Sequence, residues 1–294
     1  MMLPLGPSSK ELGRCYLGRG DLLYVEVHGM MMEMKFDKTI VILGPTASGK
    51  TGVSIRIAKY IEAQAREKGD FCGFTGAEII SADSRAIYKE MDLGTAKPLP
   101  EEQDGIPHWG IDLVNPGERF TVADWQKYAQ EKIAEIRARG HLPMIVGGTG
   151  LYIDALAFGY DFTRAAKETQ VDREEMNSEY LLVGVKTDPD TLRERIAERA
   201  NKLFVQELYD ETHRLVQKYG WGSQAMKSNI YQFAWGYLQG EYSVERAKEL
   251  FIYDDWHLAK RQMTWFKRNK NIVWLPLAEI EDYVIKCIQN EQRK

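Results

Sequence analysis

The sequence predicts an α/β protein in which helices flank a parallel β-sheet and a helical part follows at the C-terminal end. Two observations lead to this class. Short apolar, β-branched runs alternate with longer runs of helical periodicity, which is typical of parallel sheets covered by helices on both faces. The first apolar run also leads through a glycine-rich turn into a helix, which indicates a strand–turn–helix unit at the start of the core.

The elements follow one another in a regular order. The run Thr39–Leu43 is continuously apolar, as expected for a strand that is buried on both faces. Comparable runs predict further strands at 78–82, 143–147, 180–185 and 272–275. Helical periodicity predicts helices at about 49–65, 121–139, 188–219 and 243–268.

We divide the chain into four parts. Residues 1–36 precede the first convincing strand, and we expect a disordered tail or a start assigned upstream of the true one. Residues 37–158 should form the core that carries the glycine-rich turn. Residues 159–178 are charged and lack apolar periodicity, so we expect a reduced insertion or lid there, and 179–294 should supply the rest of the sheet and the helical C-terminal part.

Composition limits the class of protein. The chain has 294 residues, and a net charge of −4 excludes general attraction to nucleic acid, so any RNA contact needs a local basic surface. Three scattered cysteines predict neither a disulfide framework nor a zinc site and indicate a reducing, cytoplasmic setting. No apolar run approaches the roughly 20 residues of a membrane span, so we expect no membrane partner. We take the protein to be a monomer.

A phosphate-binding motif follows the first predicted strand. The segment 44–51 fits the P-loop pattern G-x-x-x-x-G-K-[ST], in which backbone N–H groups and a helix N-terminus surround phosphate oxygens. Lys50 adds a full charge, and the Thr51 hydroxyl can complete a Mg²⁺ shell. By itself the motif predicts a polyphosphate ligand, most simply a nucleoside triphosphate. Its residues are Gly44, Pro45, Thr46, Ala47, Ser48, Gly49, Lys50 and Thr51.

A carboxylate follows the second predicted strand. We expect Asp83 at the carboxyl end of a strand next to the P-loop strand, where it would face the ligand crevice. From the residues alone, Asp83 could hold metal-bound water, act as a general base, or cap a helix.

Several segments, taken in order and spacing, resemble the tRNA dimethylallyltransferase family. These segments are Ser81–Arg85, Ile87–Tyr88, Met91–Pro98, Ile106–His108, Ile111–Asp112, Glu118–Phe120, Val146–Tyr152, Leu258–Gln262 and Thr264–Phe266. The resemblance is strong over about 39–158 and weaker over 180–275. It implies a P-loop NTPase-like fold and a prenyltransferase. The reaction it implies moves a dimethylallyl group from dimethylallyl diphosphate to the N6 amine of the adenosine 3′ of the anticodon in tRNA.

The resemblance also implies a role for each matching residue. The P-loop would hold the diphosphate of dimethylallyl diphosphate with Mg²⁺ at Thr51, Asp83 would accept the N6 proton, and Thr149 would bond the leaving oxygen. Residues implied to contact the tRNA anticodon stem-loop are Asp83, Ser84, Arg85, Ala86, Lys260, Arg261 and Gln262. The chemistry agrees, because a delocalised exocyclic amine needs a base and the departing diphosphate needs hydrogen-bond donors.

The chain departs from the family pattern in three places. The helical insertion after the Gly-Gly-Thr segment is reduced to 159–178, which changes how tRNA would be gripped. Gln232 stands where the family carries Arg or Lys, so a cation for the diphosphate is lost, and Arg195 and Arg261 are the candidates to replace it. Ala86 stands where the family usually carries Gln, so an amide able to pair with a base edge is lost.

Three other functions remain open from sequence. An adenylate isopentenyltransferase acting on free AMP or ADP would explain the reduced insertion. A catalytically weakened RNA-binding relative would explain Gln232, although Lys50, Thr51, Asp83 and Thr149 are intact. A P-loop kinase is disfavoured because no acceptor or lid pattern is recognisable.

Overall fold

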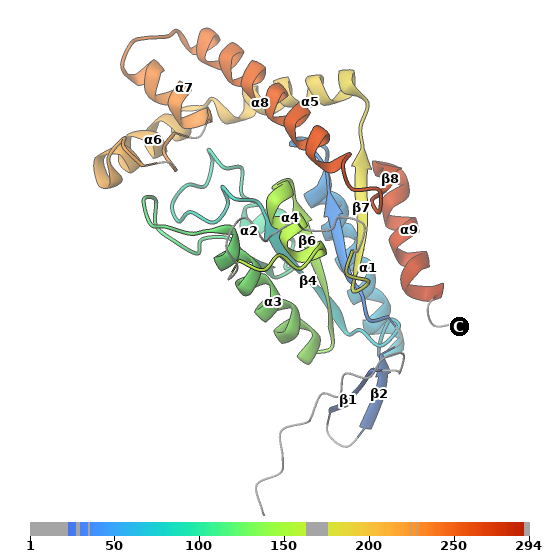
Figure 1. Ribbon diagram of the computed structural model, residues 1–294. Helices are drawn as coiled ribbons and strands as arrows, with labels where there is room; N and C mark the ends of the chain where they lie inside the picture. Colours follow the sequence, from blue (N-terminus) through green and yellow to red (C-terminus); the bar gives the residue numbers. More distant parts are fainter. Residues whose placement is uncertain are drawn as a thin grey trace, which may run out of the picture.

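The fold is a six-stranded parallel sheet with helices on both faces, followed by a helical part (Figure 1). The computed structural model describes residues 23–27, 30–34, 36–162, 176–223, 225–227 and 229–290. The sheet contains β3 Thr39–Leu43, β4 Gly76–Ala82, β5 His108–Trp109, β6 His141–Gly147, β7 Tyr180–Lys186 and β8 Val273–Pro276. Its order is β5-β4-β6-β3-β7-β8, and the predicted α/β class is confirmed.

One expectation about strand order is wrong. We expected β4, which leads to Asp83, to lie next to the P-loop strand β3, but β6 lies between them. β4 pairs with β6 over its whole length, from Gly76 opposite His141 to Ala82 opposite Gly147. Close approach at the end of this pair needs a glycine, because a Cβ at Gly147 would lie 2.2 Å from the carbonyl oxygen of Ala82. The Gly-Gly-Thr segment 147–149, at the end of β6, therefore separates the P-loop from Asp83.

Helices cover both faces of the sheet, and alternate residues of each strand point toward opposite faces. In β3, Ile40 and Ile42 pack toward α1 and α9, whereas Val41 and Leu43 pack toward α3 and α4. Figure 1 shows α1 and α9 on one side of the sheet and α3 and α4 on the other. The helices of these layers are α1 Lys50–Lys68, α3 Val122–Ala138, α4 Gly150–Ala157 and α9 Leu277–Asn290, and a short α2, Pro100–Gln103, lies in a connecting loop.

The helical part has a core of its own beyond the carboxyl ends of the strands (Figure 1). Its helices are α5 Pro189–Leu203, α6 Gln206–Tyr219, α7 Asn229–Leu238 and α8 Val244–Phe266. The single helical stretch predicted at 188–219 is two helices, because the chain turns at Phe204 and buries that ring against Phe251 of α8. Within the described part of the chain, no helix combines the length and apolarity needed to cross a bilayer.

The N-terminal region contains a small hairpin. β1 Leu23–Val27 pairs antiparallel with β2 Met30–Met34, so part of the segment 1–36 predicted as a tail has regular structure. Residues 1–22, and 163–175 of the predicted insertion, lie outside the described residues.

Candidate active site

The candidate active site is a cavity of about 590 Å³ at the carboxyl ends of β3, β4 and β6. Three loops after these strands line it, together with side chains of the helical part. The lining includes the predicted residues Thr46, Ala47, Ser48, Gly49, Lys50, Thr51, Asp83, Ser84, Arg85, Ala86, Thr149, Arg261 and Gln262. Ligands of open α/β sheets bind at this edge, because loops from neighbouring strands converge there.

The P-loop has the conformation that the motif predicts. Gly49 has φ 91°, in the left-handed region that favours glycine, and α1 begins at the next residue. The helix N-terminus is thus directed at the cavity, where it favours an anion. Gly44 and Pro45 shape the turn but do not line the cavity; the Ser48 N–H donates to the Pro45 carbonyl at 3.3 Å.

Lys50 is held inside the P-loop. Its Nζ donates to the carbonyl oxygen of Pro45 at 2.6 Å. Burial, with a smaller contribution from the Arg199 charge, lowers the pKa of Lys50 to about 8, and the Asp83 and Asp255 charges oppose this shift. Lys50 and Asp83 both line the cavity, so the predicted base and the predicted diphosphate site open into the same space.

Asp83 lies in a turn after β4. Its Oδ1 accepts the backbone N–H of Arg85 at 2.8 Å, and the residues that follow form turns and no helix. The helix-cap interpretation is therefore wrong, while the base and metal interpretations stay predictions. The second carboxylate oxygen is not needed for this turn.

Thr149 connects the loop after β6 to the loop after β4. Its Oγ1 accepts the Ser84 N–H at 2.9 Å and lies 3.3 Å from the Ser84 hydroxyl, and its own N–H donates to the Ala82 carbonyl at 3.0 Å. Thr149 thus stands between the P-loop and Asp83, and its hydroxyl proton can turn toward a ligand in the cavity.

Gln262 of α8 connects the P-loop to the Gly-Gly-Thr segment. Its Oε1 accepts the Thr46 N–H at 2.8 Å, and its Nε2 donates to the Gly148 carbonyl at 3.0 Å. Both ends of the amide are therefore used within the protein, and contact with tRNA stays a prediction. Of its neighbours, Arg261 lines the cavity, whereas Lys260 does not and lies 5.8 Å from the Trp256 ring.

Sequence analysis missed a cation of the site. Arg199 of α5 lines the cavity, donates to the Thr46 hydroxyl at 2.5 Å, and has its Nε buried with no hydrogen-bond partner among the described residues. Arg195, a predicted substitute for the missing family cation, instead donates to the Ser48 carbonyl at 3.3 Å. The two arginines are four residues apart on one helix face, and this spacing could have revealed Arg199.

Known proteins of one family resemble this chain over most of its length. The family model described as "IPP transferase" matches residues 86–181 and 162–269. A tRNA dimethylallyltransferase of Acetivibrio thermocellus is 33% identical over 306 residues, covering 83% of this chain and 93% of that protein. The chain belongs to the tRNA dimethylallyltransferase family.

Two further relatives support the assignment. The tRNA dimethylallyltransferase of Bacillus subtilis is 31% identical, covering 84% of this chain and 93% of that protein. The solved tRNA isopentenylpyrophosphate transferase of Bacillus halodurans matches with a TM-score of 0.73 and 28% identity, covering 87% of this chain and 98% of that one. These likenesses confirm the predicted family, the prenyltransferase class and the P-loop NTPase-like fold, and they do not favour the free-adenylate alternative.

The family alignment also bears on the insertion. The match to the Acetivibrio relative spans 306 residues, more than this chain's 294, although it covers only 83% of the chain. The relative therefore carries residues that this chain lacks. That these are missing from 159–178 stays a prediction, because most of that segment lies outside the described residues.

Proposed function

We propose that this chain transfers a dimethylallyl group from dimethylallyl diphosphate to the N6 amine of the adenosine 3′ of the anticodon in tRNA. Family membership supports dimethylallyl transfer to tRNA. The observation that carries the atomic proposal is the arrangement of the cavity, whose wall contains Lys50, Asp83 and Thr149, with Thr149 bonded to the loop after β4.

The diphosphate would occupy the P-loop side of the cavity. The N-terminus of α1 and the charges of Lys50 and Arg199 supply positive potential there. As the bond between the prenyl carbon and the diphosphate oxygen breaks, negative charge grows on that oxygen. A hydrogen bond donated by the Thr149 hydroxyl and the positive charge of the Lys50 ammonium would stabilise this oxygen. Arg199 would also restore the positive charge that Gln232 does not provide.

The adenine would occupy the Asp83 side of the cavity. The N6 lone pair forms the new bond to the prenyl carbon, and the proton released from N6 passes to the Asp83 carboxylate. The adenosine must leave the RNA stack to reach Asp83, which costs least for an unpaired loop nucleotide. Ser84, Arg85 and Arg261, on the cavity wall, are proposed to contact this nucleotide and its neighbours.

The donor set of the cavity fits a magnesium ion. The Thr51 hydroxyl and the Asp83 carboxylate both line the cavity, and Mg²⁺ commonly uses one or two protein oxygens together with substrate phosphates and water. Thr51 would hold the ion and Asp83 could contact its water shell. The ion would neutralise charge on the diphosphate.

One product analysis tests the proposal. The purified chain is incubated with Mg²⁺, dimethylallyl diphosphate and either an anticodon stem-loop or AMP, and the products are weighed by mass spectrometry. A gain of one prenyl group on the stem-loop, lost when its target adenosine is replaced by guanosine, is the expected result. Gain on AMP alone would refute the proposed acceptor, and RNA binding without gain would indicate a relative that has lost turnover.

A further inference from the structure

One wall of the cavity is an irregular loop, Met91–Pro98, whose residues 94–98 line the site. The loop has no regular secondary structure, and its Ala96 has φ 48°, an uncommon value for a residue with a side chain. Something outside the loop must therefore hold this backbone in place.

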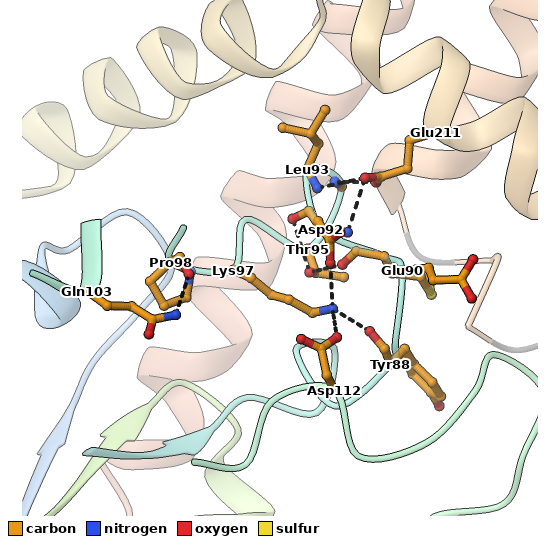
Figure 2. Close-up of polar contacts among 12 residues, drawn as sticks. Tyr88, Glu90, Asp92, Leu93, Thr95, Lys97, Pro98, Gln103, Asp112 and Glu211 are labelled. Carbon is orange, nitrogen blue, oxygen red and sulfur yellow. Dashed lines mark hydrogen bonds and ion pairs between the residues drawn. The ribbon is translucent and has the colours of Figure 1, made fainter. Parts of the chain in front are cut away.

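A carboxylate of the helical part binds the loop backbone. Glu211 of α6 accepts three successive N–H groups, from Asp92 at 3.2 Å, Leu93 at 3.0 Å and Gly94 at 3.1 Å (Figure 2). It also accepts the Tyr231 hydroxyl of α7 at 2.6 Å. Successive N–H groups that converge in this way form an anion-binding nest, and here the anion is an internal side chain only 6% exposed.

The contact around this nest is tight. A Cβ at Gly94 would lie 2.2 Å from the Tyr231 ring, so the ring packs directly on the loop backbone. Met91, at the start of the loop, is buried in the core of the helical part with Tyr231. The helical part and the cavity wall are thus joined through a hydrogen-bonded and apolar contact, and Glu90, just before the loop, adds ion pairs to Arg214 and Lys218 of α6.

A second contact ties the loop to the Asp83 side of the cavity. The Lys97 ammonium, with its side chain 4% exposed, donates to the Tyr88 carbonyl, to Asp92 at 3.0 Å and to Asp112 (Figure 2). Tyr88 lies two residues after the segment Asp83–Ala86. Backbone hydrogen bonds join residues 86–89 to residues 112–114, so Asp112 is also fixed to this segment. No hydrogen bond between described residues joins the loop to the P-loop.

We propose that Glu211 and Tyr231 are positioning residues for the acceptor nucleotide: they fix the loop 91–98 so that the wall beside Asp83 has the shape the RNA base requires. This inference rests on the proposed function. Because the loop is bonded to the segment that follows Asp83 and not to the P-loop, Glu211 acts on the acceptor side of the cavity and leaves the diphosphate side unchanged.

The test compares Glu211→Gln and Tyr231→Phe with Glu207→Gln, a matched substitution at an exposed position one turn earlier on α6. Glu211→Gln directs an amide donor at the N–H nest, and Tyr231→Phe removes a single hydroxyl. We expect kcat/KM for the stem-loop to fall about tenfold or more in Glu211→Gln and by less in Tyr231→Phe. The Kd for dimethylallyl diphosphate should stay within about twofold, and Glu207→Gln should match the wild type.

A second measurement does not depend on activity. Amide hydrogen exchange should become faster across residues 88–98 in Glu211→Gln and Tyr231→Phe, with peptides of α1 unchanged. If Glu211→Gln does not fold, Tyr231→Phe carries the test. Unchanged loop exchange, or equal loss of RNA turnover and diphosphate binding, overturns the inference. A wild-type chain that fails to prenylate the stem-loop refutes the proposed function alone, because loop exchange still reports on the nest.

Discussion

Replacing Asp83 by Asn tests the proposed base with little change to the structure. Oδ1 of Asp83 accepts the Arg85 N–H at 2.8 Å, and the amide oxygen of Asn can accept the same bond. The turn after β4 should therefore persist, with a stability loss within about 1 kcal/mol. The substituted nitrogen cannot accept a proton, so the chemical step loses its base.

The expected loss is large in turnover and small in diphosphate binding. A positioned general base contributes roughly 10²–10⁴-fold, and kcat for Asp83→Asn should fall by about that factor. The Asp83 charge raises the pKa of Lys50, so its removal lowers that pKa further. The comparison is therefore made at pH 7, below the Lys50 pKa of about 8, and the Kd for dimethylallyl diphosphate should change only a few-fold.

The assay is single-turnover transfer to a saturating stem-loop, with diphosphate binding measured separately by calorimetry. Asp254→Asn is the control, because it removes a carboxylate from the α8 wall of the same cavity. Turnover by Asp83→Asn within a few-fold of wild type would refute the base assignment. An equal loss in Asp254→Asn would show that general cavity charge, not proton acceptance at Asp83, governs the rate.

Three further predictions concern the diphosphate side. Arg199→Gln should weaken dimethylallyl diphosphate binding about 10- to 100-fold in calorimetry, as expected for a lost charged hydrogen bond, whereas Arg193→Gln, an exposed change on the same helix, should not. Gln262→Ala removes the hydrogen bonds to Thr46 and Gly148, so it should lower the melting temperature by several degrees and raise KM for dimethylallyl diphosphate. An unchanged KM would contradict the role of Gln262 as a bridge between the two loops. Since burial lowers the pKa of Lys50 to about 8, the empty site loses this charge as pH rises above 8. The affinity for dimethylallyl diphosphate should then fall by up to about tenfold per pH unit, and the Lys50→Gln variant should not show this pH dependence. If the variant keeps the same pH dependence, Lys50 is not its source.

Local sequence determined the elements and the type of chemistry. A continuous run of apolar residues indicates a buried strand whatever its neighbours in the sheet are. The spacing of the glycines, Lys50 and Thr51 defines a phosphate site through the local backbone geometry. Asp83 was singled out because it directly follows a strand and parallel strands end at one edge of the sheet. Thr149 was singled out because Val146–Tyr152 resembles the family's Gly-Gly-Thr segment.

Tertiary structure decided which of these groups meet. The position of β6 between β3 and β4 depends on pairing between residues more than 60 positions apart in sequence, and no local sequence pattern encodes such pairing. The same holds for Arg199 at Thr46, for Gln262 between two loops, and for Glu211 on the backbone of 92–94. A side chain's partner depends on the packing of whole elements, so composition and spacing identify the reactive groups while only the assembled fold assigns their contacts.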